Sequence, residues 1–180
     1  YNVAIGAYAF ASFTTASNNT AVGTYALYTN STANSNSAVG YAALYGNTTG
    51  GGNTAMGQQA GNTNTTGSSL TVIGYQALYS NSTGNENTAV GYQAGYYNQT
   101  GSYNTWMGFC AGIGVSTNSN GHNAGIGWGA LNKITTGSYN VALGSQALYN
   151  NTSATYNVGI GYQAGYTNST GDITAVGGAA

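Results

Sequence analysis

The chain is built from one short pattern of hydrophobic and polar positions that recurs from end to end. In its clearest copy, Asn87 to Gly95, an aliphatic residue precedes a glycine and an alanine follows three residues later. The eleven glycines of this pattern are Gly6, Gly23, Gly40, Gly57, Gly74, Gly91, Gly108, Gly127, Gly144, Gly161 and Gly177. Their spacing is 17 residues, apart from one step of 19 and a last step of 16. Repeats this small bury apolar surface only by stacking on one another, which predicts a solenoid.

Two positions of the repeat hold the same kind of side chain in every copy. The residue just before the glycine is always aliphatic, as at Val90, and the residue three after it is always alanine, as at Ala94. Equivalent residues of successive solenoid turns stack at about 4.8 Å. We therefore expect the aliphatic column to form a continuous interior stripe. The glycine column indicates either a positive backbone torsion or the close approach of another backbone.

Each repeat is expected to contain two short strands. Thr88 to Val90 predicts the first and Tyr92 to Tyr96 the second, with Gly91 at the bend between them. The stretch Tyr79 to Asn85 is rich in turn formers and is expected to close the coil. Repeat seven is two residues longer than most, and we place this insertion around residues 118–121.

The expected fold is all-β, a parallel β-solenoid of about eleven 17-residue turns. Proline is absent, as suits strands that all donate to a ladder, and glycine and asparagine interrupt every window long enough for a helix. Residues 1–180 are expected to form a single repeat domain that is a segment of a longer fibre.

The low charge of the chain removes whole classes of function. Among 180 residues only Glu86, Lys133 and Asp172 are charged, and the net charge is -1. Nucleic-acid binding rests on many Lys and Arg contacts to phosphate, so no nucleic-acid partner is expected. The sequence has no apolar run long enough for a membrane span. Cys110 is the single cysteine, and no Cys/His cluster predicts a metal site.

The sequence also lacks the components of a catalytic site. His122 has no carboxylate near it in sequence, and Glu86 and Asp172 stand 86 residues apart, so an acid–base pair or a triad is not expected. Residues 159–164 fit the dinucleotide-binding fingerprint formally, but no helix or ribose-binding acid follows them. We expect neither catalysis nor a cofactor.

The first repeat resembles a known family of surface proteins. Asn2-Val3-Ala4-Ile5-Gly6-Ala7, followed by Ala9 and Ala11, resembles the head repeat of trimeric autotransporter adhesins, although the period here is longer. The form Asn-Thr-Ala-Val-Gly-Tyr-Gln-Ala at residues 87–94 is also similar to repeats of bacteriophage tail fibres. The resemblance covers the whole chain. It implies a left-handed parallel β-roll, three chains side by side, and an extracellular position on a cell or virion surface.

A hydroxyl side chain stands nine residues after the glycine in every complete repeat, and in seven repeats an asparagine precedes it by two residues. Each pair forms an acceptor sequence for an N-linked glycan. The seven asparagines are Asn30, Asn47, Asn64, Asn81, Asn98, Asn151 and Asn168. The alternative is that they satisfy turn backbone groups and stack as hydrogen-bonded ladders. This alternative is favoured, because sugars attached to successive turns about 4.8 Å apart would crowd one another. A second asparagine column, four residues before the glycine, is interpreted as internal scaffolding.

Tyrosine recurs just after the glycine and again four residues later. The two sets are Tyr41, Tyr75, Tyr92 and Tyr162, and Tyr45, Tyr79, Tyr96 and Tyr166. We expect both sets to share a strand face with the alanine between them. Such stripes either pack against a neighbouring chain or form a platform on which sugar rings stack. Packing between chains is favoured, because large exposed apolar patches are uncommon without a partner.

Threonine-rich solenoid faces order water in some ice-binding proteins, and the column from Thr15 to Thr170 suggests this use. A second threonine column, which includes Thr20 and Thr88, is interrupted by valines. The expected function is therefore a structural or adhesive fibre segment that self-assembles as a homotrimer or filament. The alternatives are a carbohydrate- or ice-binding module and a phage tail-fibre shaft.

Overall fold

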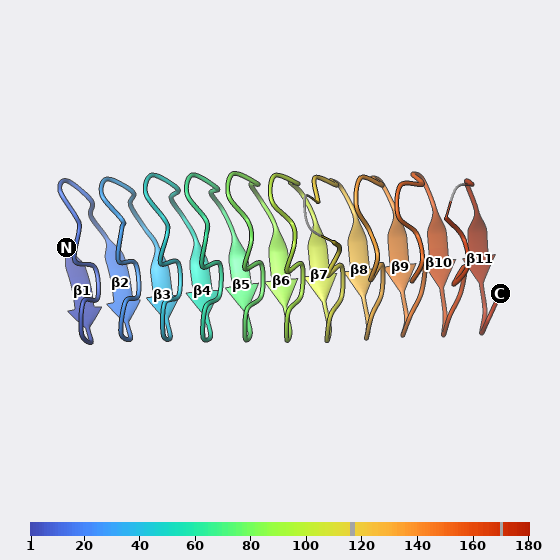
Figure 1. The fold of residues 1–180 in the computed structure, drawn as a ribbon, viewed down its shortest axis with the longest axis horizontal. Helices are drawn as coiled ribbons and strands as arrows, with labels where there is room; N and C mark the ends of the chain where they lie inside the picture. Colours follow the sequence, from blue (N-terminus) through green and yellow to red (C-terminus); the bar gives the residue numbers. More distant parts are fainter. Residues whose placement is uncertain (116–117, 170) are drawn as a thin grey trace.

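The computed structural model describes residues 1–115, 118–169 and 171–180, and it shows an all-β solenoid (Figure 1). Its strands are β1 (Asn2–Ile5), β2 (Asn19–Val22), β3 (Ser37–Val39), β4 (Thr54–Met56), β5 (Thr71–Ile73), β6 (Thr88–Val90), β7 (Thr105–Met107), β8 (Ala124–Ile126), β9 (Val141–Leu143), β10 (Val158–Ile160) and β11 (Thr174–Val176). They form one sheet in the order of the sequence. We call the repeat that begins with strand βn turn n.

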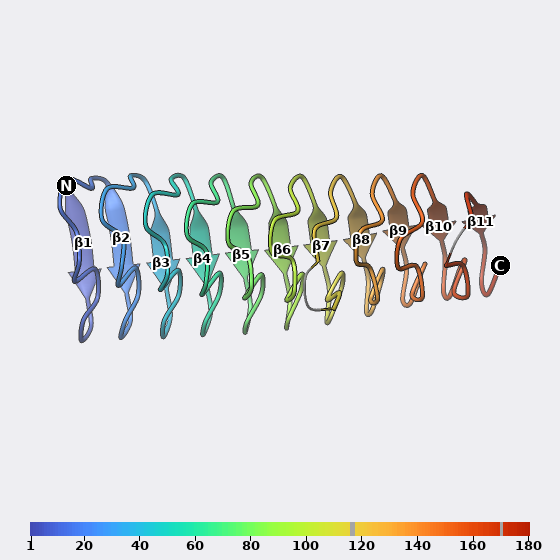
Figure 2. The same ribbon diagram turned by 45° about the horizontal axis from the view of Figure 1, so that its top comes forward.

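The register of the sheet follows the glycine spacing. Thr88 and Val90 of β6 pair in parallel with Thr105 and Met107 of β7, and every neighbouring pair is aligned in the same way. Backbone hydrogen bonds between turns continue beyond the strands, as where Leu78 N donates to Ala94 O over 2.8 Å. The loops therefore follow one another as closely as the strands do (Figure 2). The predicted parallel solenoid and its first strand are confirmed.

The second strand predicted at Tyr92 to Tyr96 is wrong, because this segment is a series of turns. Gln93 has φ 50° and Gly95 φ 63°, in the left-handed region that strands do not use. Ala94 N donates to Gly91 O over 3.4 Å and bends the chain back. The tyrosine and the alanine consequently point in different directions, since Tyr92 is exposed whereas Ala94 is fully buried.

The glycine column has both a positive backbone torsion and a close approach of another backbone, the two explanations that the sequence left open. Gly91 has φ 134°, and a Cβ there would lie 2.5 Å from the carbonyl oxygen of Gly108 in the next turn. The bend after each strand therefore needs glycine for its torsion and for the closeness of the neighbouring turn.

The aliphatic column lies outside the solenoid, so the predicted interior stripe is wrong. In β4 the middle residue Ala55 is fully buried, while Met56 is 46% exposed. We call the residues two before each glycine the inner column and those directly before it the outer column. The outer column consists of Ile5, Val22, Val39, Met56, Ile73, Val90, Met107, Ile126, Leu143, Ile160 and Val176. Strand residues alternate between faces, and the inner face admits mainly small residues because the returning loop packs against it.

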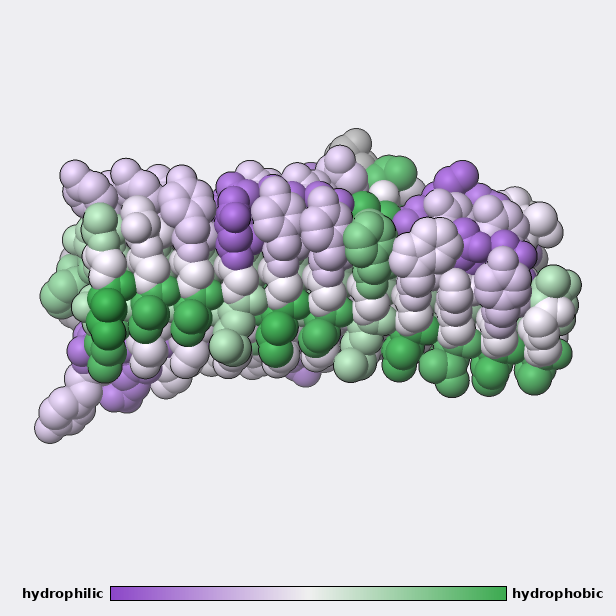
Figure 3. Space-filling view, turned by 90° about the horizontal axis from the view of Figure 1, so that it is seen from below, coloured by the Kyte–Doolittle hydropathy of each residue, from purple (hydrophilic) through white to green (hydrophobic). Residues whose placement is uncertain are grey.

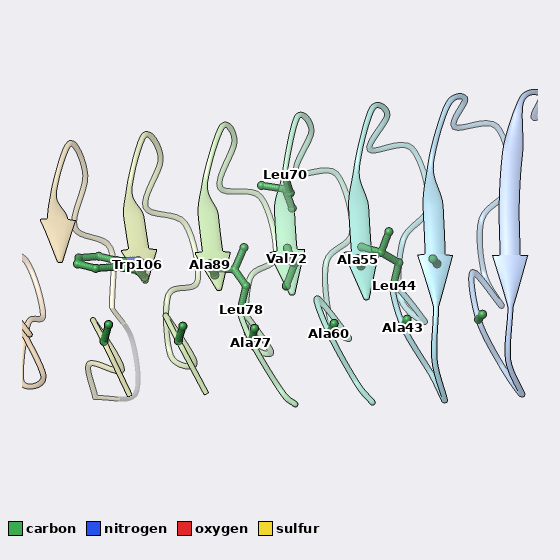
Figure 4. Close-up of a cluster of buried hydrophobic side chains, with 14 of the residues drawn as sticks. Ala43, Leu44, Ala55, Ala60, Leu70, Val72, Ala77, Leu78, Ala89 and Trp106 are labelled. Carbon is green, nitrogen blue, oxygen red and sulfur yellow. The ribbon is translucent and has the colours of Figure 1, made fainter. Parts of the chain in front are cut away.

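The core is filled by matching large and small side chains between turns (Figure 4). The inner column is mostly alanine, but turn 7 contributes Trp106, which is fully buried. Glycines beside it provide the space: a Cβ on Gly95 would lie 2.6 Å from Trp106 Cδ1, and one on Gly125 would lie 2.9 Å from its Cε3. Trp106 Nε1 has no hydrogen-bond partner among the described residues.

The insertion of turn 7 lies before Asn118 rather than around residues 118–121. Gly114 N donates to Asn132 O over 2.9 Å, as the equivalent glycine of turn 3 does to turn 4. Gln99 N donates to Asn118 O over 2.9 Å, so the regular register has returned by residue 118. Residues 114 and 118 occupy positions that are two residues apart in the other turns, and the additional length falls between them.

Candidate functional site

The asparagines four residues before the glycines form a column that is buried from Asn19 to Asn157 and interrupted by Leu70, and we call it the strand asparagine ladder. Asn36 N donates to Asn19 Oδ1 over 2.9 Å, and Asn53 N donates to Asn36 Oδ1 over 2.9 Å. Asn36 Nδ2 crosses the interior to Gly50 O in the closing loop of the same turn, over 3.0 Å. Each of these amides therefore connects neighbouring turns and also braces its own turn. The interpretation of this column as internal scaffolding is confirmed.

The asparagines of the acceptor sequences form a second buried column, the loop asparagine ladder. Asn64 Nδ2 donates to Asn47 Oδ1 over 2.8 Å and to Gly67 O over 2.9 Å, while its own Oδ1 accepts from Asn81 Nδ2 over 2.8 Å. The ladder is continuous from Asn30 to Asn98. Asn98 Oδ1 has no partner within the part of the chain that the structure describes, at the turn before the insertion.

This ladder contradicts the glycan attachment predicted at six of the seven asparagines. Asn30, Asn47, Asn64, Asn81, Asn98 and Asn151 are all fully buried. A glycan on any of them would displace the amide from its hydrogen bonds and would have no path to solvent. Asn168 is partly buried and donates to Asn157 Oδ1 over 3.0 Å, and glycan attachment there stays a prediction. The ladder alternative explains the pattern.

The hydroxyl column nine residues after the glycine is exposed but is not part of the sheet. Thr49, Thr66 and Thr83 are exposed residues of bends in the closing loops. Thr117 and Thr170, which belong to the same predicted column, lie outside the described residues. The flat strand face carries the other threonine column, exemplified by Thr54, beside the outer column. Ice binding through either column stays a prediction.

The predicted tyrosine sites divide by exposure. Tyr41, Tyr45, Tyr75, Tyr92 and Tyr162 are exposed. Tyr79, Tyr96 and Tyr166 are half-buried. The set that comprises Tyr45, Tyr79, Tyr96 and Tyr166 lies on the segment that folds back after the strand. The two sets therefore do not share a strand face with the alanine.

Rings of neighbouring turns stack face to face in both sets. The centroids of Tyr75 and Tyr92 are 5.2 Å apart with the planes 11° apart, and those of Tyr79 and Tyr96 are 5.1 Å apart at 5°. Phe109 extends the first stack at 4.9 Å from Tyr92. Rings arranged in this way cover one another's faces and present their rims to solvent. A sugar stacks on a ring face, so these continuous stretches are poor sugar platforms.

A third aromatic column, five residues before the glycine, was missed by reasoning from the sequence. Tyr103, His122, Tyr139 and Tyr156 form an exposed stack with successive centroid distances of 4.7, 4.8 and 5.1 Å. Glu86 occupies the same position one turn earlier. The shared offset from the glycine is visible in the sequence and would have revealed this column.

The few ionisable groups do not gather. Among the described residues no three His, Cys, Asp or Glu side chains approach as metal ligands. Lys133 Nζ lies 5.6 Å from the ring centroid of Tyr149. Burial raises the pKa of Tyr96 above its usual value, and the neighbouring hydroxyls, Tyr79 first, raise it further. Burial also raises the pKa of the Cys110 thiol, which lowers its nucleophilicity at neutral pH.

The parallel stacking of aromatic rings is interrupted between turns 2 and 4, where an open cavity of about 410 Å³ is present. Its lining residues are Tyr25, Tyr28, Tyr41, Ala42, Tyr45, Gln59 and Asn62. Tyr25 stacks on Tyr8 at 5.3 Å, but its plane is 86° from that of Tyr41 and 73° from that of Tyr45. This cavity was not foreseen from the sequence, where the signal was the absence of aromatic residues from turn 4.

The fold and its ladders define the chain as a parallel β-solenoid repeat protein. Comparison with known protein families, with curated proteins and with solved structures finds no match to the chain. No helix in the described part of the chain is long and apolar enough to cross a membrane.

Proposed function

We propose that the chain is a stiff structural segment of an extracellular fibre on a cell or virion surface, and that it self-assembles through its outer column. The observation that carries the proposal is the outer column itself, a row of outward-facing aliphatic side chains that are exposed except for the half-buried Val22 and Val90 (Figure 3). Homotrimeric or filamentous assembly and an adhesive or tail-fibre-like role belong to this proposal. Catalysis has no part in it.

Stiffness follows from the way successive turns are joined. Backbone hydrogen bonds link the turns along both strands and loops. The two asparagine ladders add side-chain bonds between turns, as where Asn47 Nδ2 donates to Asn30 Oδ1 over 2.7 Å. Bending the rod would stretch many of these bonds at once. At about 4.8 Å per turn, eleven turns give a rod about 50 Å long.

The outer column supports self-association because it places an aliphatic side chain on the outer face of every turn. Met56 is 46%, Ile73 38% and Met107 40% exposed, on one straight face of the sheet. Soluble monomers seldom expose continuous apolar patches of more than a few hundred Å². A second copy is the natural cover, since it carries a matching row with the same spacing and almost no charge that would be desolvated.

The proposal is tested by charging the outer column. In a triple variant with Met56→Asp, Ile73→Asp and Val90→Asp, like charges would repeat on three successive turns at the centre of the interface. We expect the parent chain to sediment as an oligomer and the variant as a monomer with an unchanged far-UV circular dichroism spectrum. Sedimentation velocity over a range of concentrations measures the oligomeric state of the parent and of the variant.

The matched control carries the same three charges on another surface. Thr49→Asp, Thr66→Asp and Thr83→Asp place the charges on exposed bends of three successive turns, with the same spacing as in the outer-column variant. This control should remain oligomeric. A parent chain that is monomeric at every concentration, or a control that dissociates as completely as the outer-column variant, contradicts self-association through the outer column.

A further inference from the structure

We propose that the cavity between turns 2 and 4 binds a neutral pyranose ring, with Tyr25 as the stacking surface and the amides of Gln59 and Asn62 as partners for its hydroxyl groups. This site goes beyond the structural role and does not depend on self-association.

The cavity exists because one small residue interrupts a column of larger ones. Two residues after the glycine, turns 1 and 2 carry Tyr8 and Tyr25, turn 3 carries Ala42, and turn 4 carries Gln59. Ala42 therefore forms the floor of a slot with Tyr25 on one side and Gln59 on the other. These two residues are two turns apart, or about 9.6 Å, which leaves room for one pyranose ring between them.

Tyr25 offers a ring face that the stacked tyrosines elsewhere do not. Its first face is covered by Tyr8, with centroids 5.3 Å apart and planes only 5° apart. On the side of turn 3, Ala42 occupies the stacking position and carries no ring that could lie parallel to Tyr25. The rings of Tyr41 and Tyr45 stand nearly perpendicular to it, at centroid distances of 6.1 and 6.2 Å, and line the same cavity. The C–H face of a pyranose is apolar and suits such an enclosed aromatic surface.

Gln59 supplies an amide donor because it stands at the end of an amide ladder. Gln93 Nε2 donates to Gln76 Oε1 over 2.9 Å, and Gln76 Nε2 donates to Gln59 Oε1 over 2.9 Å. The next acceptor would stand in turn 3, where Ala42 has none. Gln59 Nε2 therefore has no protein acceptor in the described structure.

Asn62 supplies the complementary acceptor. Its Nδ2 donates to Ala42 O over 3.0 Å, which fixes the amide and leaves Oδ1 without a protein donor among the described residues. Gln59 and Asn62 line the same cavity, so it contains one amide donor and one amide acceptor that have no protein partner among the described residues. Neighbouring hydroxyls of a sugar both donate and accept, and they match this pair.

The charge and hydrogen bonding of the cavity favour a neutral sugar over a cation. Aromatic cages also bind quaternary ammonium groups. Such a group has no hydrogen-bonding atoms, so it would desolvate the amides of Gln59 and Asn62 without replacing their bonds to water. No charged side chain lines the cavity to select a charged sugar.

Saturation-transfer NMR on the full chain tests the site, with the methyl pyranosides of glucose, galactose and mannose as probes and choline chloride as the comparison. We expect transfer to the ring C–H protons of at least one pyranoside, with a dissociation constant on the order of 1 mM for so small a contact. Transfer to choline with none to any pyranoside overturns the proposal, and so does an absence of transfer to every probe.

The Ala42→Gln variant should abolish this transfer without unfolding the chain. Ala42 has φ 53°, and the glutamines of the same column, Gln59 and Gln76, have φ 57° and 51°, so the backbone already suits glutamine. The introduced amide would fill the slot and accept from Gln59 Nε2. Cys110→Gln places the same side chain at the same position of turn 7, at φ 54°, and should bind the sugar as the parent does.

An Ala42→Gln variant that binds as well as the parent, or a Cys110→Gln variant that loses binding, overturns the assignment. Binding and sedimentation are separate measurements. Failure of the sugar site would leave the outer-column result unaffected, and monomeric behaviour of the chain would leave the binding result unaffected.

Discussion

The inner and outer columns are adjacent in the sequence, yet apart from Trp106 in turn 7 the smaller side chain faces the core and the larger one faces outward. In β5, Val72 is fully buried and Ile73 is 38% exposed, although both are aliphatic. The difference arises from space: the inner face meets the returning loop of its own turn, whereas the outer face meets nothing within the chain. A mostly small column therefore marks the core, and a column of larger aliphatic residues marks the outer face of the sheet.

The largest effect should come from breaking a ladder inside the coil. Asn64→Ala removes three buried hydrogen bonds and leaves Gly67 O and Asn47 Oδ1 without their donor from residue 64. We expect a loss of roughly 3–5 kcal/mol in the free energy of unfolding, from about 1–3 kcal/mol for each orphaned buried group. Urea unfolding followed by circular dichroism measures this loss.

Thr66→Ala is the control for this change, because Thr66 belongs to the same acceptor sequence but is exposed. It should change stability by no more than about 0.5 kcal/mol. The intact mass of the chain with Thr66→Ala should differ from that of the parent only by the mass difference between the threonine and alanine side chains. A decrease in mass by one glycan would reinstate sugar attachment at Asn64.

A smaller effect should separate the two columns directly. Val72→Ala should destabilise the chain by roughly 1.5–3 kcal/mol, since it removes fully buried methyl groups. Ile73→Ala should cost less than about 0.5 kcal/mol in a chain kept monomeric by charges elsewhere on the outer column. Thermal unfolding of both variants in that background gives the comparison, and equal losses would show that the outer column is also packed within one chain.

The smallest effect concerns the half-buried tyrosine stack. Because the pKa of Tyr96 is raised in the folded chain, the unfolded chain releases this proton first. Stability is therefore complete below the unfolded value of about 10 and falls as the pH rises through the higher folded value. We expect the melting temperature of Tyr96→Phe to decline less than that of the parent between neutral and strongly alkaline pH. Tyr162→Phe controls for removal of a hydroxyl, and an identical decline for Tyr96→Phe and the parent would contradict the expectation.

The sequence predicted the solenoid, its period and the first strand, because these depend on spacing alone. It failed where the direction of a side chain mattered. The recurrence of an aliphatic residue at the position of Val90 predicts an interior stripe, but the available volume decides that Ala89 is the residue that faces the core. The strand predicted after Gly91 failed because the left-handed torsion of Gln93 leaves no trace in residue type.

The candidate sites show the same limit. The ladder reading of the acceptor asparagines followed from their regular recurrence and is confirmed. The pocket beside Tyr25 was not predicted, because it arises from what is missing in turns 3 and 4. Departures from the repeat, such as Ala42 and Asn62, carry as much information as the consensus does.

The strand asparagine ladder passes through the lengthened turn without a break, since Asn123 N donates to Asn104 Oδ1 over 3.0 Å. Asn123 thus aligns β8 with β7 although the loop before it is two residues longer than in most other turns. A closing loop that precedes such an asparagine is consequently a place where a foreign peptide could be inserted and displayed, while the turns on either side keep their alignment.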